Sequence, residues 1–176
     1  MGAVLNESAP EARRREELLA RLEVHFGADV KRIDHAREVL KAAEELMGAI
    51  RAEPRIVVPA AILHDVGIKA AEEKFGSAAG PLQEKEGPPI ARAILEALEV
   101  PADEIEAICA IIAHHHSPGI IETREFAAVY DADCVVNLAE AAAKLPKKEL
   151  SRMIDETLLT EPGRKLAKRT YIAGGG

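Results

Sequence analysis

The sequence places an adjacent pair, His64-Asp65, directly after an uninterrupted apolar run from Ala60 to Leu63. Imidazole nitrogen and carboxylate oxygen are both good ligands for a borderline divalent metal ion. Consecutive residues point in different directions on a helix, so both can face one ion only where the helix ends or distorts. Gly67 is expected to supply that ending, because glycine is common just beyond a helix. The pair therefore predicts part of a metal site at a helix end.

Other histidines and aspartates occupy apolar or helix-terminal positions. His35 lies on an apolar stripe, the triplet His114 to His116 follows another apolar run, and Asp131 and Asp133 interrupt a third. Each alone has an ordinary explanation: a core histidine bonded to a carbonyl, a polar helix end, or an aspartate paired with an arginine. A buried polar group needs a partner, however, and helical bundles build metal sites from side chains on facing helices. Together these residues favour a metal site.

The elements that would position these residues are all predicted to be helices. Apolar residues make up 48% of the 176-residue chain and aromatic residues only 3%, whereas alanine, leucine, isoleucine and glutamate are plentiful. That composition is typical of helices packed on helices, and the length fits one domain. We expect residues 1–173 to form a single all-α helical bundle and the glycine tail, 174–176, to be disordered.

Apolar spacing and capping residues predict where the helices lie. The first starts at a capping box, Ser8 to Glu11, and ends at Gly27, and the last begins at Pro146 and breaks at Pro162-Gly163. The segment 70–88 is rich in glycine and charged residues, which predicts a short helix and a mobile loop able to close over a substrate. The remaining helices are expected over 29–52, 54–65, 88–99, 105–113, and from a cap at Thr123 through Ala142.

Charge and hydropathy exclude several classes of partner. The formal net charge of −7 argues against a nucleic-acid polymer, which needs a basic face. No segment approaches the length of a membrane span, and the amino terminus lacks the order of a signal peptide. Cys109 and Cys134 form no CxxC motif and are expected to be reduced thiols. We expect a cytoplasmic protein. A small phosphorylated substrate is compatible with the negative net charge, because a bound metal ion can invert the local field.

His35, the pair His64-Asp65 and Asp133 resemble the H…HD…D signature of the HD-domain superfamily of metal-dependent phosphohydrolases. The resemblance runs from about Ile33 to Leu138, and Ala61 to Gly67 is similar to the central motif of that superfamily almost residue for residue. It implies an HD-type helical bundle with His35, His64, Asp65 and Asp133 as ligands of one divalent ion. The ion would be manganese, iron, magnesium, cobalt, nickel or zinc.

The choice between the two late aspartates rests on the same resemblance. Asp131 is the rival ligand, but family members with an Ala-Asp pair here use the aspartate after the alanine, which favours Asp133. Because residues two apart on a helix point about 200° apart, one ion does not readily take both. Asp131 is expected to be a partner of a ligand histidine or of a basic group.

A subset of the superfamily holds two metal ions through added histidines. By that resemblance, His114 and His115 are candidate ligands of a second ion, and His116 is expected to matter less. Glu86 stands where those members carry another histidine. This departure leaves one metal site as the expectation and a second as its alternative.

The implied activity is hydrolysis of a small phosphoester, a nucleotide being the expected class. Asp65 would act in catalysis through the metal, and Lys69 would neutralise a phosphoryl oxygen, with Arg37 and Lys74 as further candidates. Few aromatic residues are available to stack a base, so loose base selectivity is expected. The alternatives are a non-catalytic metal-containing module that binds a nucleotide or partner, and a di-iron oxygenase-like protein.

Overall fold

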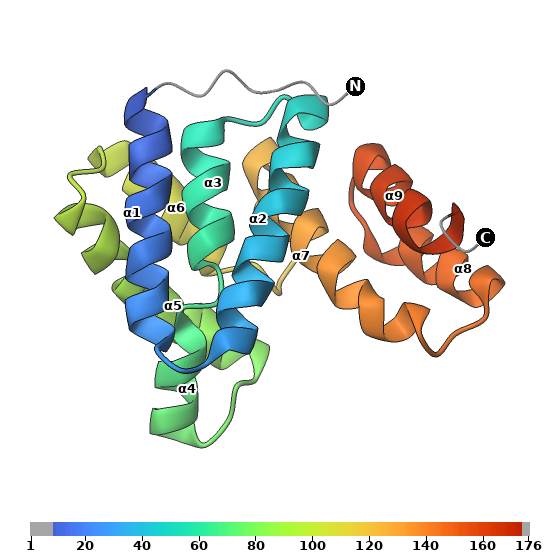
Figure 1. Ribbon diagram of the computed structural model, residues 1–176, viewed down its shortest axis with the longest axis horizontal. Helices are drawn as coiled ribbons and strands as arrows, with labels where there is room; N and C mark the ends of the chain where they lie inside the picture. The colour runs from blue at the N-terminus through green and yellow to red at the C-terminus, as the bar shows by residue number, and fades with distance from the viewer. Residues whose placement is uncertain (1–8, 174–176) are drawn as a thin grey trace.

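The computed structural model describes residues 9–173, which form helices and connecting turns with no strand among them (Figure 1). The predicted all-α fold is confirmed. Ser8 of the expected capping box and the tail 174–176 lie outside the described residues. The helices are α1 Ala9–Phe26, α2 Val30–Ile50, α3 Pro54–Leu63, α4 Gly67–Phe75, α5 Gly80–Ala97, α6 Ala102–Ile112, α7 Arg124–Ala142, α8 Lys147–Thr157 and α9 Glu161–Lys168, followed by a π-helical turn, Arg169–Ala173.

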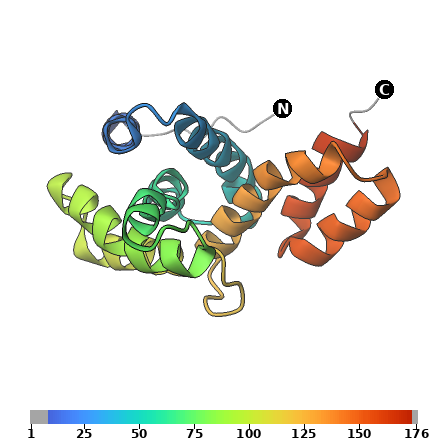
Figure 2. The same cartoon turned by 90° about the horizontal axis from the view of Figure 1, so that it is seen from below.

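Helix α3 lies in the middle of the fold, with α1 and α2 on one side and α6 on the other (Figure 2). Its sequence is apolar on nearly every face, and Val57 and the run Ala60 to Leu63 are fully buried. A helix that is apolar all round has to be surrounded by other elements. The residues that follow it, His64-Asp65, therefore emerge inside the molecule.

Helices α2 and α7 pack along one another and cover one flank of α3. The predicted apolar stripe of α2 is buried, including Ile33, Val39 and Leu40. Thr123 caps α7 as predicted, because its Oγ1 accepts a hydrogen bond from the Phe126 backbone N at 3.1 Å. This pairing brings the second turn of α2, at His35, and the centre of α7, at Asp133, to the end of α3.

The segment 70–88 contains the predicted short helix, as the end of α4, but the predicted mobile loop after it is wrong. Only residues 76–79 connect α4 to α5, and α5 begins at Gly80, with Pro88 and Pro89 inside it rather than at its start. Gly87 in this segment, and Gly67 before it, serve close helix packing instead of flexibility. A Cβ at Gly67 would lie 2.4 Å from the Gln83 carbonyl oxygen, and one at Gly87 would lie 2.8 Å from the Ile112 side chain.

The predicted helix break at Pro162-Gly163 is also wrong in position. Helix α8 ends at Thr157, and Pro162 lies in the first turn of α9, where a missing N–H costs nothing. The Thr160 Oγ1 caps α9 by accepting a hydrogen bond from the Gly163 backbone N at 3.0 Å. Helices α8 and α9 thus form a hairpin.

The carboxylate of Asp131 on α7 holds this hairpin. It accepts hydrogen bonds from the backbone N of Leu159 at 2.8 Å, from the backbone N of Thr160 at 2.9 Å and from the Thr160 hydroxyl at 2.6 Å. Burial raises the pKa of Asp131, and these hydrogen bonds oppose that rise. A Cβ at Gly163 would lie 2.2 Å from this carboxylate, so only glycine fits there.

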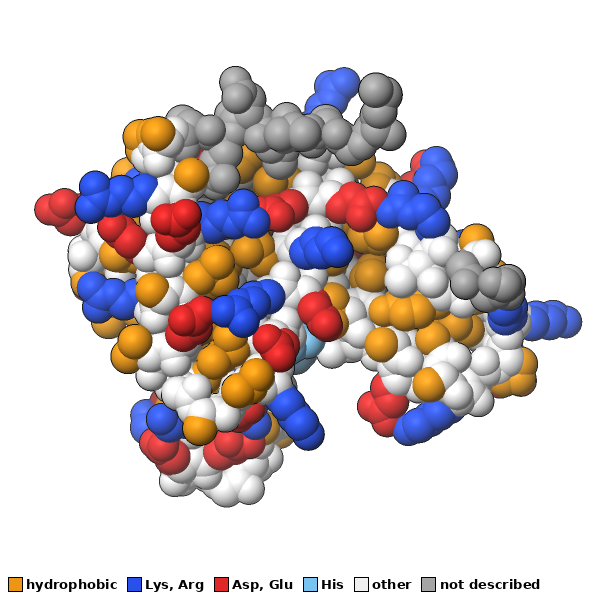
Figure 3. Space-filling model, viewed as in Figure 1, with side chains coloured by type: hydrophobic (Ala, Val, Ile, Leu, Met, Phe, Trp, Pro, Cys, Tyr) orange, Lys and Arg blue, Asp and Glu red, His pale blue; other side chains and the backbone are white. Residues whose placement is uncertain are grey.

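The hairpin stands apart from the body of the other helices, and a notch separates the two on the face drawn in Figure 3. A histidine side chain is visible at the edge of the notch. Cys109 and Cys134 are both free thiols, as predicted. Within residues 9–173, every helix is too short or too polar to cross a lipid bilayer.

The contact at Gly67 yields a stability prediction. Gly67→Ala is expected to lower the free energy of unfolding by about 1–3 kcal/mol, because the new methyl group would meet the α5 backbone, which cannot rotate away as a side chain can. The matched control is Gly48→Ala in α2, where a Cβ meets nothing within 4 Å. The control should gain about 0.5–1 kcal/mol. Chemical denaturation of both variants measures the difference, and equal stabilities would contradict the prediction.

Candidate metal centre

The pair His64-Asp65, called the HD pair from here on, lies in a short turn, residues 64–66, between the end of α3 and the start of α4. His25 of α1 ties this turn down, because its Nε2 lies 2.9 Å from the Val66 carbonyl oxygen and must donate the hydrogen bond. Gly67 does not end the helix in a left-handed conformation as expected; it is the first residue of α4. The turn itself directs both His64 and Asp65 inward.

Four predicted ligands converge at this point from α2, the turn and α7. The His35 Nε2 lies 3.0 Å from Asp133 Oδ1 and 3.6 Å from Asp65 Oδ2. The His64 Nε2 lies 3.4 Å from Asp65 Oδ2 and 3.6 Å from Asp133 Oδ1. Asp131, the rival to Asp133, points instead to the α8–α9 hairpin. We call His35, His64, Asp65 and Asp133 the inner cluster.

The tautomers of two buried histidines are fixed by backbone carbonyls. His64 Nδ1 lies 2.8 Å from the Ala61 oxygen, and His115 Nδ1 lies 2.7 Å from the Ile112 oxygen. A carbonyl only accepts, so each Nδ1 carries the hydrogen and each Nε2 can offer a lone pair. Both Nε2 atoms are buried and lack a hydrogen-bond partner among the described residues. A buried nitrogen without a hydrogen-bond partner costs free energy unless another group, such as a metal ion, binds its lone pair.

The separations within the inner cluster suit an ion. Ligand atoms about 2.1 Å from a metal, at tetrahedral or octahedral angles, are about 3.0–3.4 Å from one another. The four separations above, 3.0, 3.4, 3.6 and 3.6 Å, are close to this range, and three of them are long for a hydrogen bond. The donor set of the cluster therefore fits a divalent metal ion.

The electrostatics of the inner cluster also favour a bound cation. Burial alone would lower the pKa of His64, but the carboxylates of Asp65 and Asp133 outweigh it and raise that pKa well above 6.5. Burial would likewise raise the pKa of both carboxyl groups, yet the neighbouring histidines lower them below the ordinary value. The site thus has a strong preference for positive charge, which a cation can satisfy in place of a proton.

A second group of possible ligands shares Asp65. The ligand atoms of Asp65, His115 and His116 lie within 4.8 Å of one another, and His115 Nε2 is 3.5 Å from Asp65 Oδ1. The other oxygen of Asp65 faces His35 and His64. Asp65 therefore has one oxygen toward each group, the arrangement needed to bridge two ions.

His116 is fixed by residues of α5. Its Nε2 lies 3.2 Å from Gln83 Oε1, while the Gln83 amide nitrogen donates to the Ala78 carbonyl, so the histidine must donate this hydrogen bond. The His116 backbone N also donates to Glu84 Oε1 at 2.9 Å. The Nδ1 lone pair of His116 remains available, and burial lowers the pKa of this ring.

Two of the residues expected at a second site are placed elsewhere. Among the described residues, His114 does not belong to either ligand group, whereas His116, which was expected to matter less, does. Glu86 is buried and forms an ion pair with Lys74. The geometry thus favours His115 and His116, rather than His114 and His115, as the histidines near Asp65.

The cations expected to assist catalysis are not gathered at the inner cluster. Lys69 is exposed on α4, and its charge contributes to lowering the pKa of His25. Lys74 and Arg37 are both held in ion pairs with acidic side chains.

Sequence reasoning missed two residues that support the site, Gln83 and Asn137, and gave His116 a lesser role than its position indicates. Gln83 and His116 form the hydrogen bond described above, and Asn137 donates from Nδ2 to Asp133 Oδ1 at 2.9 Å. Asn137 follows Asp133 by one helical turn of α7, which is the signal that could have identified it. No comparable pattern marks Gln83.

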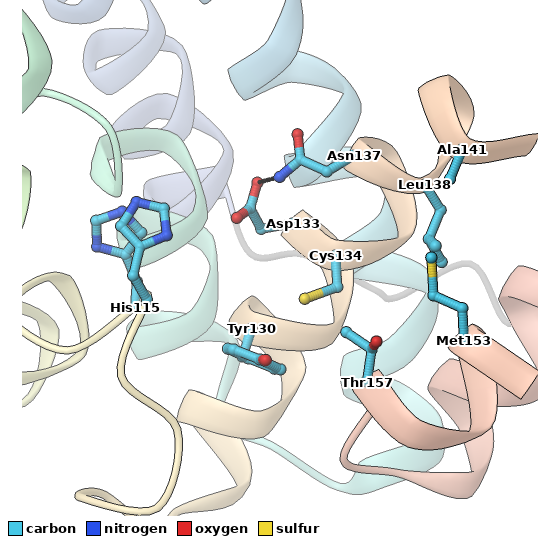
Figure 4. Close-up of a pocket in the computed structure, with 10 residues that line it drawn as sticks. His115, Tyr130, Asp133, Cys134, Asn137, Leu138, Ala141, Met153 and Thr157 are labelled. Atoms are coloured by element: carbon cyan, nitrogen blue, oxygen red, sulfur yellow. Dashed lines mark hydrogen bonds between the residues drawn. The ribbon is translucent and has the colours of Figure 1, made fainter. Parts of the chain in front are cut away.

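A cavity of about 270 Å³ opens beside the two ligand groups (Figure 4). His115, His116 and Asp133 line its inner end, and Met153 and Thr157 of α8 line the opposite wall. Its volume is near the lower end of ordinary ligand pockets, which are roughly 300–1,000 Å³. The site can therefore admit a compact small molecule next to the candidate metal ligands.

The orphaned His64 nitrogen yields a prediction about metal binding. His64→Ala is expected to weaken the binding of a divalent ion by more than about 100-fold, since even loss of an outer-shell partner costs about 10–100-fold. The matched control is His114→Ala, which removes a histidine outside both ligand groups. Elemental analysis and equilibrium dialysis with Mn²⁺ measure the effect. A His64→Ala protein that keeps one tightly bound ion would contradict the assignment.

The raised pKa of His64 yields a pH prediction. At about pH 7 the metal-free protein is expected to carry a proton on His64, because the pKa lies well above 6.5, and an ion must displace that proton to bind. Affinity for Mn²⁺ should therefore rise with pH until the raised pKa is passed. Calorimetric titrations in buffers of different ionisation enthalpy should show release of about one proton per ion. A binding heat that does not depend on the buffer would contradict this.

Comparison with known proteins agrees with the geometry. The HD domain model matches residues 32–157. Among solved structures, the chain is similar to a predicted HD superfamily hydrolase from an uncultured Thermotogales bacterium, with 22% identity and a TM-score of 0.65 over 89% of this chain and 84% of that one, which supports the fold. None of the curated proteins compared with the chain matches it. HD domains bind divalent metals, which supports a metal-dependent hydrolase in general terms. The chain belongs to the HD domain family.

Proposed function

We propose that the protein is a metal-dependent phosphohydrolase that acts on a small phosphoester, with mononucleotides as the expected substrate class. One observation carries the proposal: two buried histidine nitrogens that have no hydrogen-bond partner within residues 9–173 face Asp65 at the inner end of an open cavity. Membership of the HD domain family supports it.

In this proposal His35, His64, Asp65 and Asp133 hold one divalent ion. Mixed imidazole and carboxylate donors suit manganese, iron, cobalt, nickel or zinc better than magnesium, which prefers oxygen ligands alone. Once bound, the ion would polarise a phosphoryl oxygen and lower the pKa of a water molecule. The protein would fix the ligands: the Ala61 carbonyl orients His64, and Asn137 orients Asp133.

Hydrolysis of a phosphomonoester forms one bond from the water oxygen to phosphorus and breaks the ester P–O bond. The water loses a proton and the leaving oxygen gains one, so a group at the site must move it. His116 is suited to this step in a one-metal enzyme. Its lowered pKa keeps it neutral at neutral pH, and its Nδ1 lone pair is available because Nε2 donates to Gln83.

The second ligand group, Asp65 with His115 and His116, favours one competing candidate. Two ions bridged by Asp65 would also fit a di-iron oxygenase-like protein. Elemental analysis together with an optical spectrum distinguishes the two, because bridged iron absorbs visible light and a manganese or zinc phosphohydrolase does not show that band. A non-catalytic binding module would hold a metal and ligand without turnover.

The proposal predicts turnover that depends on Asp65. A screen of phosphate esters and mononucleotides with added Mn²⁺ or Fe²⁺ should show phosphate release by the wild type, and Asp65→Ala should lose at least about 100-fold of it, since the change removes a group that faces both sets of ligands. The matched control is Asp103→Ala, an exposed aspartate in the first turn of α6, which should keep wild-type rates. Equal phosphate release by the wild type and Asp65→Ala on every compound would reject the proposal.

A further inference from the structure

The cavity beside the metal centre extends away from the ligands along one face of α7. Tyr130, Cys134, Leu138 and Ala141 line it at helical spacing, and Met153 of α8 closes the far side (Figure 4). The ligands of the candidate metal ions are thus at one end, and the α8–α9 hairpin is at the other.

The side chains that line the cavity beyond the metal ligands are uncharged. Tyr130 contributes a hydroxyl and Cys134 a thiol, and neither type of side chain ordinarily carries a charge at neutral pH. Thr157 adds a hydroxyl, and Leu138 and Ala141 add apolar surface. A charged group placed against such a wall would lose hydration without gaining an ion pair.

Met153 is the unusual member of this wall. Met153 is 37% exposed, although methionine is a large apolar residue. Its side chain faces the cavity beside Leu138 (Figure 4). A ligand that occupied the cavity would cover this apolar surface and gain free energy from its burial. The exposed surface is therefore matched to an apolar or uncharged ligand part.

We propose that the cavity binds the uncharged part of a compact phosphomonoester, and that Met153 and Thr157 determine specificity for it. The inference rests on the proposed function, because it places the phosphate at the inner cluster. In such a phosphomonoester the phosphate is the only charged group, and it would lie at the inner cluster. The additional phosphates of a di- or triphosphate would lie against the neutral wall, so nucleoside monophosphates and smaller esters are preferred.

Methionine NMR tests this proposal without requiring catalysis. The chain has three methionines, of which Met47 is buried in the core and Met1 lies outside the described residues. With [methyl-13C]methionine-labelled protein loaded with Zn²⁺, uridine 5′-monophosphate should shift the Met153 signal and leave Met47 unmoved. Inorganic phosphate should leave Met153 unmoved, and uridine 5′-triphosphate should shift it only at concentrations at least about 10-fold higher, equivalent to about 1.4 kcal/mol.

Kinetics supply the second measurement. Met153→Ala should raise KM for the monophosphate about 10-fold with little change in kcat, because it removes contact with the part of the substrate that does not react. Thr157→Val should act in the same direction, whereas Met153→Lys should lower KM for the triphosphate. The matched control is Leu159→Ala, which removes an exposed apolar side chain of the same hairpin and should behave as the wild type.

The outcomes separate this inference from the proposed function. A shifted Met153 signal without phosphate release supports the binding cavity and rejects the hydrolase. Phosphate release with an unmoved Met153 signal at saturating monophosphate supports the hydrolase and overturns the cavity assignment. Identical KM values for Met153→Ala and Leu159→Ala would also overturn it.

Discussion

The site depends on two hydrogen bonds from histidine side chains to the carbonyls of their own helix ends. Ala61 and Ile112 each accept from an Nδ1, and each bond turns an Nε2 toward Asp65. The last carbonyls of a helix lack backbone partners, so α3 and α6 each offer an acceptor where they stop. The same bond therefore caps a helix end and presents a metal ligand. The central position of α3 keeps these ends inside the fold, where unpaired nitrogens are costly and an ion is stabilising.

The elements that carry the inner cluster could be predicted from the sequence because apolar periodicity is local information. His35 lies on the buried stripe of α2, and Asp133 interrupts the buried face of α7, so their inward direction follows from helical spacing. The HD pair follows the most apolar helix. Apolar periodicity could not predict the structural role of the glycines. Gly67 signals a helix end and Gly87 a flexible segment when read alone, but in the structure they allow α4, α5 and α6 to approach closely.

The triplet His114 to His116 shows a different limit of prediction from the sequence. Three consecutive residues at a helix end point in three directions, and the turn that follows decides which of them face Asp65. That turn is fixed by contacts distant in sequence: Glu84 accepts a hydrogen bond from the His116 backbone, and Gln83 accepts one from its ring. Because the first half of α5, residues 80–87, was predicted as part of a loop, these contacts could not be anticipated. The order of preference within the triplet therefore depends on the position of α5.

Helix α7 links the metal centre to the cavity wall. Asp131 and Asp133 are two residues apart and point in opposite directions, one to the α8–α9 hairpin and one to the inner cluster. The hairpin carries Met153 and Thr157, so Asp131 sets where the far wall of the cavity stands relative to the ligands. One rigid helix therefore fixes both the position of the candidate metal and the length of the space beside it. The two aspartates that competed for one role in the sequence therefore have separate roles: Asp131 holds the α8–α9 hairpin and Asp133 belongs to the inner cluster.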